Sequence, residues 1–477
     1  YYRFIKTKLM KYFLFILRLV SFWLLFFLIN RFLFALLFIK EVSKNSVSEV
    51  LKIIPKSIGL DISFISYVLV IVVLLIWTNS FLNKKLILSR IIYWLNCLLL
   101  FISGIINGSE ISLYSEWSSK LNFKALSHLS NPSEVISSAS LEHIFISIFF
   151  IFISIIFVII YKRLIHIHLP FESNMKTVKK IILLPLLLSV LLLGARGGAQ
   201  PIPINLSDAY FSKSIILNDI AVNPNWNIIQ SILKSKAHLK GNPYRKHTDT
   251  NCNNFIIDVK SSRNDSSFLV IDSEQPNIIF ILLESWSADN IESLGGLKGI
   301  TPNFNNLQEE GLLFTDFYSN GWTSDQAMSS IFSSFPVFPY VAIINQADKA
   351  RKLPCLNKSL SKSGYHSSYF FGGQLTYGNI KGYLLNQGFD LVRDEDNYKD
   401  LPSGKLGVHD EFMFVQFKNE ISKLPQPFFS TFFTISSHSP YDFPSDHEIS
   451  FNHKQDKYVN SVAYTDKCLG DFMKSIK

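Results

Sequence analysis

The chain has 477 residues, of which 48% are hydrophobic, 14% aromatic and only 17% charged. Because soluble globular proteins carry about 25% charged residues, this composition argues against a wholly soluble enzyme, a disordered chain, a collagen and a small disulfide-rich protein. The formal net charge of +9 suits a membrane protein facing anionic lipid as well as a protein that binds nucleic acid. The four cysteines form no Cys-x-x-Cys pair and therefore predict no zinc site.

Five apolar runs precede residue 195, and no run of comparable length follows it. They are roughly Tyr12–Phe38, Ile62–Trp77, Leu86–Ile106, Ile144–Tyr161 and Ile181–Gly194. A helix crosses a bilayer with about 20 apolar residues, so the second and fifth runs need flanking residues. Arg18 and Arg31 interrupt the first run, where they either extend to the membrane surface or mark a helix break near Asn30. Five such runs favour membrane insertion over buried soluble helices and predict a membrane domain of about five transmembrane helices over residues 1–195.

Lysine and arginine set the expected orientation of this domain. Basic residues are concentrated at the N-terminus and in the loops after the second and fourth spans, whereas the loop between the third and fourth spans is more acidic. Four lysines after the first span run against this pattern. On balance we expect a cytoplasmic N-terminus and a multi-pass protein of the cell (inner or plasma) membrane, with everything after Arg196 outside the cytoplasm.

Residues 196–265 predict a linker, and residues 266–477 predict a separate α/β domain. In the linker, Asn223–Trp226 predicts a turn followed by a short amphipathic helix. After residue 266, strand signals at Asn277–Leu283, Leu313–Tyr318, Ser367–Phe371 and Phe428–Ile435 alternate with helical signals at Asn303–Glu310 and from Ala327 onward. This alternation predicts a largely parallel sheet with helices on both faces, in which ligands bind at the carboxyl ends of the strands.

Two polar groups lie at such strand ends. Glu284 directly follows the first strand, where its carboxylate suits either a divalent cation or the positive end of a helix dipole. Thr323, Ser324 and Asp325 follow the second predicted strand and precede a helix. A hydroxyl at a helix N-terminus is well placed to attack a phosphate, but these residue types are also ordinary helix caps.

The order of several motifs resembles lipoteichoic acid synthase and related phosphoglycerol transferases, in the sulfatase-like branch of the alkaline phosphatase superfamily. The motifs are Pro276-Asn277, Glu284-Ser285-Trp286-Ser287, Thr301-Pro302-Asn303-Phe304, Asn320-Gly321-Trp322-Thr323-Ser324-Asp325, Phe371-Gly372-Gly373, Gly407-Val408-His409-Asp410-Glu411 and Ser436-Ser437-His438-Ser439-Pro440. The five-span N-terminal part fits as well. The resemblance therefore covers nearly the whole chain.

The resemblance implies roles for individual residues. Glu284 and Thr323 resemble ligands of one divalent metal, Mn²⁺ or Mg²⁺, and Thr323 matches the threonine nucleophile. His438 resembles a substrate-contacting histidine, its alternative being a satisfied core histidine. Asn379 and Lys381 lie where the family places head-group contacts, although the tryptophan and arginine of lipoteichoic acid synthase are missing there. We expect structural roles for His366 and His409.

Two departures from related families limit the implied chemistry. The Cys-x-Pro-x-Arg signature of true sulfatases is absent around Thr323, which argues against a formylglycine sulfatase. Relatives also carry an Asp-His pair that completes the metal site, after a helix matching Val459–Ile476. Because this chain stops at Lys477, we expect the catalytic domain to be C-terminally incomplete, the remaining metal ligands to lie beyond Lys477 and this fragment to be inactive.

The sequence thus predicts a metal-dependent phosphoglycerol transferase of the cell envelope with sulfatase-like architecture. Its partners would be a phospholipid donor in the membrane and a glycan or polymer acceptor, with no role for nucleic acid. The transfer would proceed through a phosphothreonine intermediate on Thr323. The alternatives are a phosphoethanolamine transferase or a phosphodiesterase or sulfuric-ester hydrolase of the same superfamily, and a non-catalytic truncated membrane relative.

Overall fold

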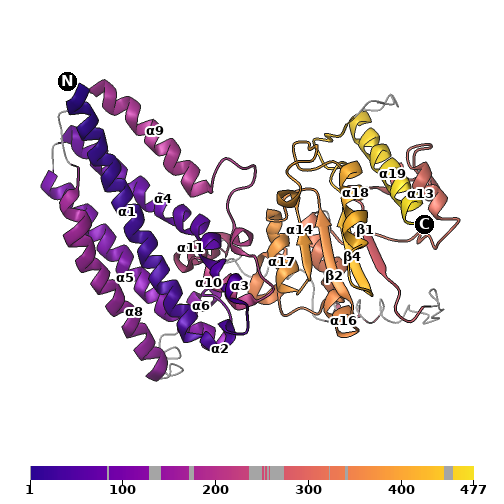
Figure 1. Cartoon of the computed structure of the whole chain (residues 1–477), viewed down its shortest axis with the longest axis horizontal. Coiled ribbons are helices and arrows are strands. Elements are labelled where there is room, and N and C mark those ends of the chain that lie inside the picture. The colour runs from indigo at the N-terminus through magenta and orange to yellow at the C-terminus, as the bar shows by residue number, and fades with distance from the viewer. Residues whose placement is uncertain are drawn as a thin grey trace. The chain divides into compact units, whose positions relative to one another are not determined.

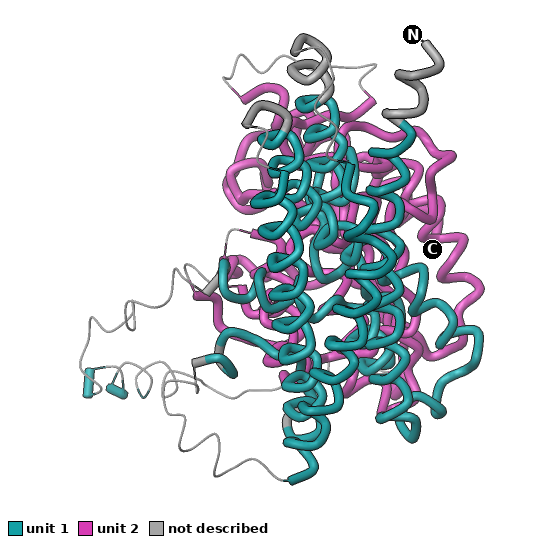
Figure 2. The backbone as a smooth tube through the Cα atoms, turned by 90° about the vertical axis from the view of Figure 1, so that its left-hand side faces the viewer, with its two compact units in different colours: residues 1–272 teal, residues 273–477 magenta. Residues whose placement is uncertain are grey.

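The computed structural model describes two compact units, residues 1–272 and residues 273–477, which are coloured separately in Figure 2. Within them, the described chain leaves out residues 1, 83–84, 128–140, 171–176, 236–249, 252, 255–256, 258–272, 322, 339–341 and 445–454.

The first unit is a multi-span helical membrane domain built from long apolar helices (Figure 1). Its main helices are α1 (Tyr2–Leu37), α4 (Ile53–Leu82), α5 (Lys85–Trp117), α8 (Leu141–Ile160) and α9 (Thr177–Arg196). Shorter elements are α2 (Ile39–Val42), α3 (Val47–Leu51), α6 (Phe123–Ser127), a π-helical turn (Tyr161–Ile165) and a 3₁₀ turn (His166–His168). Among the described residues, four stretches are long and apolar enough to cross a membrane: Met10–Leu37, Val47–Asn79, Lys85–Glu116 and Leu141–His168.

The fifth predicted span lies within α9, but its apolar stretch, Leu184–Arg196, is shorter than the other four. α9 nevertheless packs closely on α4. A Cβ added at Gly194 would lie 2.4 Å from the Ser66 hydroxyl, and Ser63 donates a hydrogen bond to the Ala195 carbonyl at 2.6 Å. A total of five spans therefore stays a prediction.

Small residues set the distance between α5 and α8. A Cβ added at Gly108 would lie 2.8 Å from the Ser147 Cα, and one added at Gly104 would lie 2.4 Å from the Ser154 hydroxyl. Such close backbone approach is typical of membrane helix pairs, where small residues replace the hydrophobic driving force available in water.

Both sequence-based alternatives for Arg31 are wrong. Helix α1 continues through Asn30, whose side-chain amide donates to the Phe26 carbonyl one turn earlier. Arg31 does not reach the surface either, because its side chain is 7% exposed and forms a bidentate ion pair with Asp61 of α4. The patterns of single apolar runs could not reveal a partner thirty residues away.

The predicted linker contains ordered structure that packs on the membrane helices. A 3₁₀ turn (Leu206–Ala209) precedes helices α10 (Ile215–Ala221) and α11 (Pro224–Ser235), which contact α1, α4 and α5. The predicted amphipathic helix is α11, but the turn predicted over Asn223–Trp226 is wrong, because α11 already begins at Pro224 and buries Trp226 against the bundle. Residues up to 235 therefore belong structurally to the first unit.

The second unit is a three-layer α/β sandwich around a parallel sheet. Its strands are β1 (Ile278–Leu282), β2 (His366–Phe371), β3 (Leu391–Arg393) and β4 (Phe428–Phe433), in the order β1-β4-β2-β3. Its helices are α13 (Pro302–Leu307), α14 (Ser324–Ser333), α15 (Ala347–Ala350), α16 (Leu356–Lys362), α17 (Ile380–Asn386), α18 (Asp410–Ile421) and α19 (Asp456–Ile476). Short 3₁₀ turns lie at Ala288–Asn290, Glu292–Leu294, Ile343–Asn345, Tyr377–Asn379 and Glu395–Asn397.

Alternate residues of the strands face opposite layers, as the period of a β-strand requires. Phe429 and Phe433 of β4 join a core with α14, α16 and α17, whereas Phe428 and Phe432 join a core with α13, α18 and α19. Figure 1 shows these two sets of helices on opposite sides of the sheet. The predicted fold class is thereby confirmed, and β4 is its fully buried centre.

The predicted strand at Leu313–Tyr318 is wrong. These residues are irregular, and the side chains of Phe314, Phe317 and Tyr318 are mostly exposed. A strand needs a hydrogen-bonded neighbour, and within the described residues none of the four strands runs beside this segment. The short strand β3 was missed because three residues carry too little periodicity.

Candidate functional site

Glu284 lies in the turn that follows β1, at the carboxyl edge of the sheet. The turn is fixed by the neighbouring strand, since Thr434 after β4 accepts from the Glu284 amide at 2.9 Å and Ser437 donates to the Glu284 carbonyl at 2.6 Å. Ser285 adopts a left-handed backbone conformation, with φ of 58°. The carboxylate is therefore held in place by its main chain and projects from the edge where the sequence placed it.

Two serine hydroxyls donate to the Glu284 carboxylate. Ser285 donates to Oε1 at 2.9 Å, and Ser324 at the start of α14 donates to Oε2 at 3.4 Å. The resemblance pairs Glu284 with Thr323 as ligands of one metal. In the structure Ser324 faces Glu284 instead.

Thr323 occupies the N-cap position of α14 with an extended backbone, and its side chain is exposed and makes no capping hydrogen bond. Thr323 thus stands at the N-terminus of α14, the end of a helix that attracts anions through the helix dipole. Asp325 is committed elsewhere, because it accepts from the Gln326 amide at 3.0 Å and from Asn345 at 3.3 Å.

The loop after β4 carries His438 to the same edge. The His438 Nδ1 atom lies 2.6 Å from the Ser439 carbonyl, so Nδ1 carries the proton and Nε2 is left for another partner. Ser437, the preceding residue, is bonded to the Glu284 main chain. The structure thus brings Glu284, the start of α14 and the His438 loop together because β1 and β4 are parallel neighbours.

Asp410 is a supporting residue that the sequence analysis missed. Its buried carboxylate accepts from the Ile435 amide at 2.9 Å, the Ser436 amide at 3.2 Å and the Thr465 hydroxyl at 3.0 Å. It therefore joins the start of α18 to α19 and to the loop that carries His438. The only signal in the sequence was the position of Asp410 within the motif Gly407–Glu411, and it gave no partner.

The remaining predicted residues have structural partners. Asn379 is buried and donates to the Ile344 carbonyl, and Lys381 pairs with Asp394 at 2.7 Å. His366 lies 3.8 Å from the Asp390 carboxylate.

His409, expected to be structural, is the N-cap residue of α18 and is mostly buried, which lowers its pKa. It lines a small pocket together with His438 and Asp442. The proximity of these two histidines could not be foreseen, because it depends on the register between the α18 start and the β4 loop.

The described residues do not make up a complete metal site. They contain no group of three or more His, Cys, Asp and Glu side chains that could hold an ion. Around Glu284 they supply one carboxylate and several hydroxyls, which are oxygen donors of the kind Mn²⁺ and Mg²⁺ prefer, but both carboxylate oxygens already accept from serines.

Comparison with known proteins supports the class of the second unit. Residues 276–477 match the family model described as Sulfatase, which confirms the predicted resemblance to the sulfatase-like branch.

Three individual relatives illustrate this similarity. The lipoteichoic acid synthase-like protein YvgJ of Bacillus subtilis is 28% identical over 42% of this chain and 34% of its own. The lipoteichoic acid synthase of Staphylococcus aureus is 26% identical over 43% and 34%. An alkaline phosphatase superfamily protein of Vibrio parahaemolyticus has 29% identity over 48% of this chain and 59% of that chain, with a TM-score of 0.42. The aligned region thus spans about a third of the curated relatives.

Proposed function

We propose that the protein is a membrane-bound transferase that moves phosphoglycerol, or a related phospho head group, from a phospholipid to an extracytoplasmic glycan or polymer. The observation that carries the proposal is the meeting of Glu284, the α14 hydroxyls and the His438 loop at one edge of the sheet. The sulfatase match and the lipoteichoic acid synthase relatives indicate the class of reaction. The membrane helices anchor the site to the bilayer that contains the donor lipid.

The proposed reaction has two displacement steps. The Thr323 hydroxyl attacks the phosphorus of the lipid head group, an O–P bond forms, the P–O bond to diacylglycerol breaks, and the threonine proton ends on the departing diacylglycerol. An acceptor hydroxyl then attacks the same phosphorus, and the proton of that hydroxyl returns to Thr323 as the phosphothreonine bond breaks. No nucleotide is needed, which suits a compartment without ATP.

The neighbouring groups give this reaction its geometry. The positive end of the α14 dipole favours the negative phosphate, and the Nε2 atom of His438 can accept a hydrogen bond from a head-group hydroxyl. Asn379 and Lys381 are proposed as further head-group contacts. To reach the head group, Asn379 would give up its hydrogen bond to the Ile344 carbonyl, and Lys381 would give up its ion pair with Asp394. The predicted Mn²⁺ or Mg²⁺ would take Glu284 and Thr323 as two of its ligands.

The choice between the two adjacent hydroxyls is directly testable. Thr323 is exposed and carries no capping bond, whereas Ser324 already donates to Glu284. In a protein that carries a complete metal site, Thr323→Ala should abolish release of diacylglycerol from a fluorescent phosphatidylglycerol, whereas Ser324→Ala should leave the rate within about an order of magnitude. Thr323→Ser keeps the hydroxyl and should keep some activity. The reverse pattern would assign the nucleophile to Ser324, and near wild-type turnover by both alanine variants would refute a covalent route.

The proposed orientation places residues after Arg196 outside the cytoplasm. Reporter fusions after residue 175 and after residue 260 should then report opposite compartments, because α9 crosses the membrane between them. The same compartment for both fusions would contradict the five-span topology. Product analysis with phosphatidylethanolamine in place of phosphatidylglycerol would identify the head group.

A further inference from the structure

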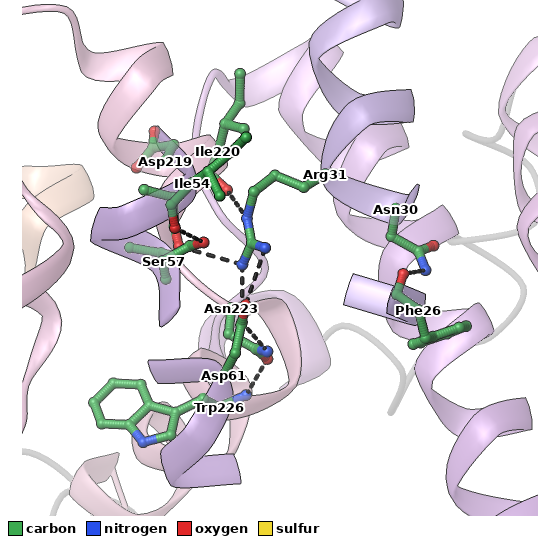
Figure 3. Close-up of polar contacts among 12 residues, drawn as sticks. Phe26, Asn30, Arg31, Ile54, Ser57, Asp61, Asp219, Ile220, Asn223 and Trp226 are labelled. Atoms are coloured by element: carbon green, nitrogen blue, oxygen red, sulfur yellow. Dashed lines mark hydrogen bonds and ion pairs between the residues drawn. The ribbon is translucent and has the colours of Figure 1, made fainter. Parts of the chain in front are cut away.

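A buried ion pair links the membrane helices to the segment that follows them. Arg31 of α1 forms two hydrogen bonds with the Asp61 carboxylate of α4, at 2.8 and 3.0 Å, and the two side chains are 7% and 3% exposed. The same guanidinium donates through Nε to the Ile220 carbonyl at 2.9 Å. Figure 3 shows Arg31 between Ile220 on one side and Asp61 on the other.

A second buried pair repeats this arrangement. Lys120 lies 2.6 Å from the Glu110 carboxylate of α5, and the two side chains are 9% and 1% exposed. The Lys120 ammonium also donates to the carbonyls of Asp219 at 2.8 Å and Val222 at 3.2 Å. Each cation therefore contacts one membrane-helix carboxylate and the last turn of α10.

These contacts satisfy the carboxyl end of α10. The last carbonyls of a helix lack partners within the helix and carry partial negative charge, so cations bind there. Asn223 donates to the Asp61 carboxylate at 2.8 Å. Its side-chain oxygen also accepts from the amide of Trp226, in the first turn of α11, at 3.1 Å. The Trp226 indole in turn donates to Ser63 of α4 at 3.2 Å.

All of these groups lie at one end of the helical unit. Arg31 and Glu110 are near the carboxyl ends of α1 and α5, and Asp61 is near the start of α4. The end of α9 joins them through the bond from Ser63 to the Ala195 carbonyl. Along the chain, residues 219–226 lie between the last membrane helix, α9, and the second unit, so these contacts fix a segment that precedes that unit in the sequence.

We propose that the Arg31–Asp61 and Lys120–Glu110 pairs form a latch that holds residues 215–226 on this end of the membrane domain, and that the latch must be closed for the catalytic unit to use a lipid in the bilayer. This role of the latch in lipid use rests on the proposed transferase function. The latch depends on charge, because removing one member leaves its partner buried and uncompensated, whereas removing both members does not.

Hydrogen exchange of the full chain in lipid nanodiscs tests the latch. Asp61→Asn keeps the side-chain shape but leaves Arg31 without a counter-charge, and should raise exchange of the amides of residues 219–226 about tenfold or more. Lys120→Met should act in the same direction. Asp396→Asn, which breaks an exposed ion pair with Lys399 in the other unit, is the matched control and should change nothing.

The double variant Arg31→Met with Asp61→Leu separates loss of charge balance from general misfolding. It should exchange more slowly than Asp61→Asn over residues 219–226, and β4 should stay protected in every variant. Unchanged exchange of residues 219–226 in both Asp61→Asn and Lys120→Met would overturn the latch. So would a double variant that exchanges faster than the single one.

A transfer assay on the same nanodiscs tests whether the latch must be closed for head-group transfer. Head-group transfer from phosphatidylglycerol in the nanodisc should fall in Asp61→Asn in proportion to the fraction of molecules in which the latch stays closed, as hydrogen exchange measures it. Transfer at the wild-type rate with an open latch would overturn the coupling to function. Absence of transfer by a wild-type protein that carries a complete metal site would refute the proposed function, while the exchange result would still decide the latch itself.

Discussion

Replacing Asp410 tests how the fold holds the loop that carries His438. The buried carboxylate accepts from two amides of that loop, Ile435 and Ser436, and from Thr465 of α19. Asp410→Ala would leave these donors buried without an acceptor, at a cost of about 1–3 kcal/mol for each group that stays unsatisfied. We expect local opening of the loop to become easier by about 3 kcal/mol, after water has replaced part of the lost bonding.

The same residue predicts a pH dependence with a definite sign. Burial raises the pKa of Asp410 to about 6, despite the hydrogen bonds that it accepts. The folded state therefore binds the proton more tightly than the unfolded chain, whose aspartates have pKa values near 3.9. This stabilisation is fully present below about pH 4 and is lost as the pH rises through about 6. The difference between these two pKa values corresponds to about 3 kcal/mol of stabilising free energy.

Native-state hydrogen exchange of the Ile435 and Ser436 amides measures this effect in the full chain. Asp410→Asn cannot ionise, so the free-energy difference between the wild type and this variant should shrink as the pH rises from 4.5 to 6.5. The comparison at each pH removes the contribution of His409, whose lowered pKa acts in the opposite direction. A difference that stays constant with pH would show that Asp410 does not titrate in this range.

Three further variants test other parts of the structure. Asp466→Ala should destabilise the second unit by about 1 kcal/mol, because Asp466 of α19 accepts from the Asn303 and Phe304 amides at the start of α13. Asp471→Asn on the exposed side of α19 is its control, and equal melting temperatures for both variants would contradict the capping role. Gly108→Ala should lower the temperature at which the detergent-solubilised chain aggregates, since the added Cβ meets the Ser147 backbone, whereas Gly311→Ala, with 3.5 Å of clearance, should not. Lys381→Ala should raise the apparent KM for the lipid donor and Asp394→Ala should not, and equal effects would assign the Lys381–Asp394 pair a purely structural role.

The sequence predicted those features that depend on local pattern. The strand signal before Glu284 and the buried run at Phe428–Ile435 correspond to β1 and β4, because strands covered on both faces are continuously apolar. The apolar runs likewise correspond to α1, α4, α5 and α8. Strand order was not predictable, because β1 and β4 are 145 residues apart and become neighbours only through tertiary pairing.

The details of the site depended on that pairing. The placement of Glu284 followed from the end of one strand, but Ser437 and His438 reach it only because β4 lies beside β1. Which hydroxyl of the pair at the start of α14 contacts Glu284 depends on the phase of the helix, and in the structure it is Ser324. The partner of Arg31 was hidden for the same reason, since pairing between helices leaves no local pattern.

The central claim is that Thr323 carries the head group during transfer, and peptide mass spectrometry of the full chain in nanodiscs tests it most directly. After brief reaction with phosphatidylglycerol and acid quenching, the peptide containing residues 320–330 should gain the mass of one phosphoglycerol group. Fragmentation should place this group on Thr323, and Thr323→Ala should abolish it. Turnover with no adduct on this peptide, or an adduct on Ser324, would contradict the account.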